Sequence, residues 1–239
     1  MPTQKQPCRS LVASVLFAVV LFLFILSFSI ALPIYFRPFY YMHIDPLEIE
    51  LKSGFSHEEV VEAYNGTLDY LTLPNQEFDT GVLKYSDIGK AHFDDCKVLF
   101  NINGGILVGS ALCLAVLMIL KKRKKLGEFR IGRFSARFYS GIAAILVPLV
   151  IGVLASINFD KAFKVFHHVL FPNKDNWILD WRTDELILIL PEEFFRNCAI
   201  LIGASILIFS GTLIAVEIIR KSKRRNNDYS QTRLMKGEL

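Results

Sequence analysis

The chain has 239 residues, 52% of them hydrophobic and 21% charged, with a net charge of +4. The basic residues border long apolar runs, so this charge indicates membrane topology and gives no sign of nucleic-acid binding. The 4 cysteines are scattered between outer, inner and apolar segments. That distribution excludes a disulfide framework and favours unpaired thiols that act as small apolar side chains.

Four apolar runs divide the chain, and each is free of charge apart from Glu217 near the end of the last one. A helix needs roughly 20 apolar residues to cross a hydrocarbon core of about 30 Å, and all four runs are long enough. We therefore predict a mainly α-helical membrane protein with an extracytoplasmic cap built from two outer segments. The predicted transmembrane helices cover 10–36, 98–120, 138–159 and 197–219, and the outer segments cover 37–97 and 160–196.

Lys and Arg gather before the first run, in the loop 121–137 and in the tail 220–239. Because basic residues accumulate in cytoplasmic loops, we predict that this loop and both termini are cytoplasmic. We also weighed a cleaved signal peptide for the first run. The run exceeds the usual apolar core of roughly 7 to 15 residues, and cleavage would leave three spans with conflicting charge bias, so we expect it to be retained.

The first outer segment contains two predicted helices. Ser56-His57-Glu58-Glu59 matches a capping box and predicts a helix that ends near Leu73-Pro74. A second helix is predicted to begin near Ser86 and to run through Asp95 into the second span. On this helix His92 and Asp95 share a face and Asp94 points elsewhere, so we expect Asp95 to hold the imidazole of His92.

The second outer segment repeats this design. An apolar stripe recurs at helical spacing, with His167 along its edge and Pro172 ending the helix. The stripe consists of Phe159, Phe163, Phe166 and Leu170. Trp177 then fits an interfacial anchor, and a short apolar helix over 186–190 leads into the last span. Both His92 and His167 are thus predicted on the outer side, where an imidazole can exchange a proton near neutral pH.

A series of short motifs surrounds the spans in a fixed order. The motifs are Gly54-Phe55-Ser56, Tyr70-Leu71, His92-x-x-Asp95-x-Lys97, Phe166-His167-x-x-x-Phe171, Trp177-x-x-Asp180-x-x-x-Asp184-x-Leu186-Ile187 and Pro191-Glu192-x-Phe194-Phe195. This series resembles the bacterial lipoprotein intramolecular transacylase family, from the first span to the fourth but not in the tail. Cys96 stands where that family commonly has valine.

The resemblance implies an enzyme of the bacterial cell membrane with its active site on the extracytoplasmic face. Such an enzyme moves the sn-2 acyl chain of a diacylglyceryl-modified lipoprotein to the α-amino group of the same N-terminal cysteine, which gives the lyso-form. His92 and His167 fall on the catalytic histidines of the family, and His168 does not. Diacylglyceryl lipoproteins and membrane lipids are the expected partners, and no cofactor, metal or nucleic acid is expected.

The proton transfers that such a reaction needs are consistent with a catalytic role for these two histidines. An amine that attacks an ester must lose a proton and the departing oxygen must gain one, so two groups with pKa near 7 suit the reaction. No Gly-x-Ser-x-Gly elbow, Gly-rich phosphate loop or zinc-type cysteine pairing is present. We predict supporting or substrate-binding roles for Asp95, Lys97, Tyr40 and Trp177, with Lys97 or Tyr40 as donor to the oxyanion.

Two other classes remain open from the sequence. A metal-dependent membrane hydrolase could hold zinc with His92, Asp95 and His167, since two histidines and a carboxylate make an open site. A membrane scaffold or transporter is the second alternative. Only Glu217 lies within the spans as a clear acid, and no polar pathway crosses their centres, so the transport hypothesis has little support.

Overall fold

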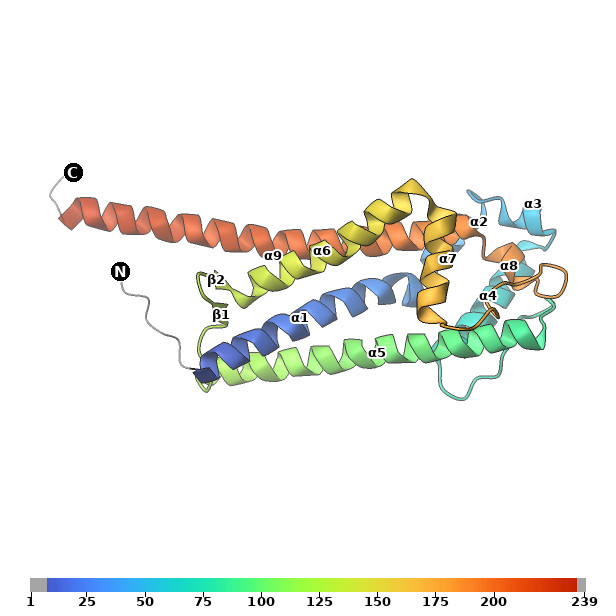
Figure 1. Cartoon of the computed structure of the whole chain (residues 1–239), viewed down its shortest axis with the longest axis horizontal. Coiled ribbons are helices and arrows are strands. Elements are labelled where there is room, and N and C mark those ends of the chain that lie inside the picture. Colours follow the sequence, from blue (N-terminus) through green and yellow to red (C-terminus); the bar gives the residue numbers. More distant parts are fainter. Residues whose placement is uncertain (1–7, 236–239) are drawn as a thin grey trace. The chain divides into compact units, whose positions relative to one another are not determined.

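The computed structural model describes residues 8–235, without the side chains at 8–10, 147, 151, 154–156, 228, 229 and 231–235. The described chain is mainly helical (Figure 1). Its helices are α1 (Cys8–Tyr35), α2 (Pro38–Ile44), α3 (Ile49–Ser53), α4 (His57–Thr72), α5 (Asp87–Lys122), α6 (Ala136–Ile157), α7 (Phe159–Leu170), α8 (Leu186–Ile189) and α9 (Glu192–Met235). Two short strands, β1 (Arg130–Ile131) and β2 (Phe134–Ser135), form a hairpin.

Three described helical stretches are long and apolar enough to cross a membrane, namely Leu11–Tyr35, Asp87–Lys122 and Glu192–Asn227. The first stretch lies within the first predicted span, 10–36, and the other two contain the second and fourth predicted spans. Helix α6 contributes a shorter apolar stretch, Ala136–Val150, so the third span over 138–159 stays a prediction. Helix α5 begins well before the predicted span 98–120, and this extension carries His92 and Asp95.

The chain forms two compact units. The first comprises the described parts of 1–26, 108–148 and 205–239, and the second comprises 27–107 and 149–204. Both histidine motifs belong to the second unit. The second unit contains both predicted outer segments together with parts of the predicted spans, and the extracytoplasmic cap stays a prediction.

Within the first unit, the basic loop predicted over 121–137 contains the β1–β2 hairpin. Gly132 takes a left-handed φ of 58° at its turn, where a residue without Cβ is favoured. The Ser135 amide donates to Glu217 Oε1 at 3.0 Å, so this acid has a partner in the hairpin. Lys221 Nζ lies 3.3 Å from the ring centroid of Phe134. Helix α9 continues into the basic tail predicted over 220–239 and is described as far as Met235.

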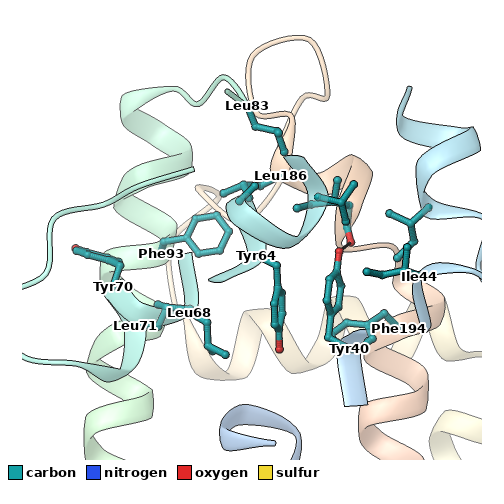
Figure 2. Packing of buried hydrophobic residues seen from close by; sticks show 14 of the residues in the cluster. Tyr40, Ile44, Tyr64, Leu68, Tyr70, Leu71, Leu83, Phe93, Leu186 and Phe194 are labelled. Atoms are coloured by element: carbon teal, nitrogen blue, oxygen red, sulfur yellow. Dashed lines mark hydrogen bonds between the residues drawn. The ribbon is translucent and has the colours of Figure 1, made fainter. Parts of the chain in front are cut away.

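The second unit has an apolar core that joins both outer segments (Figure 2). Ser56 and Glu59 form the predicted capping box at the start of α4, which ends at Thr72 as expected. Tyr40 and Tyr64 stack with ring centroids 3.8 Å apart. The core consists of Tyr40, Ile44, Ile49, Val60, Ala63, Tyr64, Leu68, Tyr70, Leu71, Phe78, Leu83, Phe93, Leu186, Ile189 and Phe194.

The N-terminal end of α5 is fastened to the second outer segment by Asp184, which is buried. Asp184 Oδ1 accepts hydrogen bonds from the Ser86 amide at 2.8 Å and from the Ser86 hydroxyl at 2.9 Å. Gly89 makes room for this carboxylate, because a Cβ there would lie 1.9 Å from Asp184 Oδ1. This contact fixes the part of α5 that precedes His92.

Candidate active site

His92 lies on the N-terminal extension of α5 and is only 8% exposed. Its ring meets the ring of Phe171 edge-on, with centroids 5.1 Å apart. One helical turn later, Cys96 Sγ lies 3.6 Å from His92 Nε2. The other ring nitrogen, Nδ1, is buried and has no hydrogen-bond partner among the described residues.

His167 is the buried residue of α7, at 8% exposure. Its Nδ1 lies 2.8 Å from the carbonyl oxygen of Phe163. Because a carbonyl oxygen only accepts, Nδ1 carries the proton in the neutral ring and Nε2 keeps its lone pair. Trp177 stacks on the imidazole, with centroids 4.8 Å apart and planes 24° apart. These contacts hold the ring from two sides.

The two imidazoles face each other with centroids 5.9 Å apart and planes 41° apart. Phe171 contacts both rings, since its centroid is 5.9 Å from that of His167 as well. His168 is exposed and meets the edge of Trp177 at 5.3 Å. The structure thus brings together the two histidines selected from the motifs and leaves their neighbour outside the pair.

The predicted apolar stripe of α7 is not its buried face. Phe166 is 56% exposed and Leu170 37%, whereas His167 between them is covered. A helix that turns an imidazole inward must turn the residues beside it outward, because successive residues are rotated by about 100°. Phe166 and Leu170 are therefore exposed, whereas Phe163 of the same stripe packs against the His167 ring, with centroids 4.3 Å apart.

Burial keeps both histidines neutral at neutral pH. Desolvation lowers the pKa of His92 to about 4, and the nearby charge of His167 lowers it further, while Asp95 partly opposes the shift. Desolvation also lowers the pKa of His167, with the hydrogen bond to Phe163 acting in the opposite direction. A neutral imidazole has a free lone pair, so either ring can accept a proton.

Asp95 does not hold the imidazole of His92, contrary to our prediction. Its Oδ1 accepts from Lys174 Nζ at 2.6 Å and its Oδ2 from Asn176 Nδ2 at 2.9 Å. These hydrogen bonds, first that of Lys174 and then that of Asn176, lower the pKa of the carboxyl group. An ammonium donor outcompetes a neutral imidazole for a carboxylate, which explains the outcome.

The other predicted supporting residues, Lys97, Tyr40 and Trp177, make different kinds of contact. Lys97 Nζ lies 3.8 Å from the ring centroid of Tyr70, in a cation–π contact. Tyr40 is fully buried and its hydroxyl donates to the carbonyl oxygen of Ile189 at 2.8 Å, so its proton is already engaged. The prediction that Tyr40 donates to the oxyanion is therefore wrong for this arrangement. Trp177, predicted as an interfacial anchor, contacts His167 directly.

Sequence reasoning missed the turn after α7. In the sequence, Lys174 and Asn176 belong to a polar turn with no recognisable motif, yet they supply both hydrogen-bond partners of Asp95. No spacing rule could have found them, because the pairing joins two segments that are distant in the sequence. Pro172, which ends the helix, was the one local signal that the chain turns back here.

The predicted zinc ligands do not converge. Among the described residues there is no group of three or more His, Cys, Asp or Glu side chains arranged to hold a metal ion. The Asp95 carboxylate, which the metal hypothesis needs, pairs with Lys174 and Asn176. The donor set in this part of the chain therefore does not fit a metal site.

The residues matched by one family model include both histidine segments. The model of a family described as lipoprotein intramolecular transacylase Lit matches residues 15–195. An uncharacterized protein of Aquifex aeolicus (strain VF5) is 30% identical over 95 residues, or 40% of this chain and 43% of that protein. The match thus spans less than half the length of that relative.

Solved structures resemble the whole fold. The in meso structure of the membrane integral lipoprotein intramolecular transacylase Lit from Bacillus cereus is 25% identical, with a TM-score of 0.81 over 92% of this chain and 99% of that one. Two variants of the same protein, with a histidine replaced by arginine or by alanine, have TM-scores of 0.72. They are 24% and 25% identical, cover 90% of this chain, and are themselves covered to 93% and 94%.

Proposed function

The chain belongs to the lipoprotein intramolecular transacylase Lit family, and from this premise we propose that it transfers an acyl chain within one lipoprotein molecule. The acyl chain at the sn-2 position of a diacylglyceryl-modified N-terminal cysteine moves to the α-amino group of that cysteine. The product is the lyso-form, which carries an N-acyl chain and an S-monoacylglyceryl group.

The observation that carries this proposal is the pair of buried, neutral imidazoles with centroids 5.9 Å apart. Acyl transfer from an ester to an amine requires one proton to leave the nitrogen and one to reach the departing oxygen. Two imidazoles side by side meet both needs. No protein nucleophile is required, because the amine attacks the ester directly.

We assign the first proton transfer to His167. Its Nδ1 donates to the Phe163 carbonyl, so its Nε2 lone pair is free to accept a proton from the attacking nitrogen. His92 takes the complementary role of donor to the departing glyceryl oxygen. Its Nδ1 pairs with no acceptor among the described residues and is thus available as an N–H donor.

The step balances without a co-reactant. A nitrogen–carbon bond forms between the α-amino group and the acyl carbonyl, and the carbon–oxygen bond of the sn-2 ester breaks. The proton that His167 takes from nitrogen passes on to His92 as His92 protonates the glyceryl oxygen, so both imidazoles end neutral, as they began. Since amine and ester belong to one molecule, correct positioning can supply up to roughly 7 to 11 kcal/mol of the barrier reduction.

The substrate class also accounts for the location of the site. Both acyl chains of a diacylglyceryl lipoprotein lie in the membrane, and its peptide lies outside. We place His92 and His167 at the extracytoplasmic edge of a bacterial cell membrane, with both termini of the chain in the cytoplasm. The apolar face of α7, including Phe166 and Val169, is exposed and free to contact membrane lipids.

Mass spectrometry of the product tests the proposal. Full-length protein in detergent micelles is incubated with a synthetic diacylglyceryl lipopeptide, with and without a chelator. Intramolecular transfer adds and removes no atoms, so the intact mass should stay constant while fragmentation shows one acyl chain moved from the glyceryl group to nitrogen. An unreacted sample supplies the reference fragmentation pattern.

Other reactions give other masses. A hydrolase would release a fatty acid and leave a lighter peptide, and an acyltransferase acting between two molecules would produce a heavier one. Either result would overturn the proposal. Loss of a fatty acid that depends on the absence of chelator would support a metal-dependent hydrolase instead.

A further inference from the structure

The turn after α7 places an ammonium group on Asp95. Lys174 Nζ lies 2.6 Å from Asp95 Oδ1, and Asn176 Nδ2 lies 2.9 Å from Oδ2. A carboxylate offers about four lone-pair sites, so these two donors leave further acceptor capacity. The Asp95 carboxylate therefore binds one ammonium group and can accept further hydrogen bonds.

Asp95 is linked to both histidine segments. It follows His92 by three positions on α5, which puts the two side chains on one face of the helix. On the other side, Asn176 directly precedes Trp177, whose ring stacks on His167 at 4.8 Å. A nitrogen bound to Asp95 would thus lie between the helix that carries His92 and the turn whose Trp177 stacks on His167.

Asn176 supplies a second acceptor. Its Nδ2 donates to Asp95, which leaves its Oδ1 as the second acceptor, and this oxygen is buried with no partner among the described residues. A buried acceptor without a donor is costly, and such groups call for an explanation. An ammonium ligand with three N–H donors can satisfy Asp95 and Asn176 together.

Lys174 is a replaceable occupant of this position. Its side chain is 50% exposed in the ion pair, and that of Asp95 is 24% exposed. Exposed ion pairs contribute little to stability, so exchanging one ammonium group for another is nearly neutral in free energy. Lys174 follows Asn173, which has a left-handed φ of 61° at the turn.

We propose that Asp95 and Asn176 bind the α-ammonium group of the lipoprotein's N-terminal cysteine, and that Lys174 occupies this subsite in the free enzyme. The inference rests on the proposed function and adds the residues that recognise the nucleophile. The bound ammonium first loses one proton to solvent, and the resulting amine passes a further proton to His167 Nε2 as it attacks the ester. Lys174 then competes with the substrate for Asp95.

Binding of a non-reactive ligand tests this subsite apart from the reaction. The probe is a lipopeptide with ether-linked chains in place of both esters, so no acyl group can move. A matched probe lacks the α-amino group. Affinities of both probes are measured for the full-length protein in detergent micelles, and for the variants Lys174→Met, Asp95→Asn and, as control, Lys164→Met. Lys164 pairs with Asp160 in another exposed ion pair, on α7.

We expect Lys174→Met to bind the amino probe about threefold more tightly, because a weak competing ion pair is removed. Asp95→Asn should bind it about tenfold more weakly, since a charge-assisted hydrogen bond is lost. The probe without an amino group should bind all variants alike, which also shows that they are folded. Lys164→Met should match the wild type with both probes.

Weaker binding of the amino probe to Lys174→Met would overturn the proposal, because it would make Lys174 a structural support of the site. Equal weakening of both probes by Asp95→Asn would do the same. If Asp95→Asn fails to fold, the Lys174→Met result decides alone. Failure of the transacylase proposal itself would appear in product masses and not in these affinities.

Discussion

The ring of Phe171 touches both His92 and His167, with centroids 5.1 Å and 5.9 Å away. Phe171 directly follows α7, and its amide donates to the His167 carbonyl oxygen at 2.8 Å. The end of α7 therefore sets the spacing of the imidazole pair. Pro172 stops the helix at this point, so the chain places an aromatic ring where the two histidines meet.

Removing either imidazole of the pair should abolish most of the activity. We expect His92→Ala and His167→Ala each to lower kcat by roughly two to four orders of magnitude, because proton transfer is lost in both cases. His168→Ala is the matched control, since His168 is exposed outside the pair. Turnover is measured on the lipopeptide at equal protein levels. Equal losses at 167 and 168 would indicate a packing role for the segment.

The predicted topology can be tested at three exposed turn residues, Asn75, Lys124 and Asn173. Charge asymmetry predicts that Asn75 and Asn173 face outside and that Lys124 faces the cytoplasm. Cysteines introduced at 75 and 173 should react with a membrane-impermeant maleimide in intact cells, and a cysteine at 124 only after lysis. The unsubstituted protein gives the background labelling. Labelling at 124 in intact cells would contradict the whole orientation.

Much of the second unit could be predicted because its signals are local. The capping box of Ser56 and Glu59 depends on residues three apart, and α4 begins where that box places it. The continuous helix α5 was expected from an uninterrupted helical pattern between Ser86 and the second span. The pairing of His92 with His167 came from the motifs of a family, since no periodicity joins two segments so distant in sequence.

The errors arose where distant polar groups compete. Spacing put Asp95 on the face of His92, but a carboxylate selects the strongest donor in reach, and Lys174 comes from another segment. The hydroxyl of Tyr40 could not be known to bond Ile189 without the packing of the core. In the first unit, the β1–β2 hairpin was missed because each strand has only two residues, too few for an alternating pattern.

Gly89 approaches Asp184 so closely that replacing it by alanine should lower the stability of the protein. A Cβ at 89 would lie 1.9 Å from Asp184 Oδ1 and 2.8 Å from its Cγ, so Gly89→Ala should displace the carboxylate that holds Ser86. We expect a loss of about 1–3 kcal/mol, as for other overpacked sites. Gly105→Ala, on the same helix with no atom within 4 Å of the new Cβ, is the control and should not destabilise. Thermal unfolding in detergent measures both, and equal midpoints would contradict this account.

The buried state of His92 predicts how stability depends on pH. Its pKa is about 4 in the folded chain, below the ordinary 6.5 that applies after unfolding. Between these values the unfolded chain binds a proton that the folded chain does not, so acidification favours unfolding. Burial of this neutral ring therefore costs nothing at pH values well above 6.5. The cost grows as the pH falls from 6.5 to about 4, and stability falls with it.

At pH 5, this single group should have lowered the free energy of unfolding by roughly 2 kcal/mol relative to pH 7. His92→Gln, which cannot be protonated in this range, should lose correspondingly less between the two pH values. His167 keeps its own lowered pKa in the variant, so a smaller shift of the same sign should remain. The measurement is the thermal midpoint of both proteins in detergent at pH 7, 6 and 5. Parallel curves for wild type and variant would show that His92 is not buried in its neutral form.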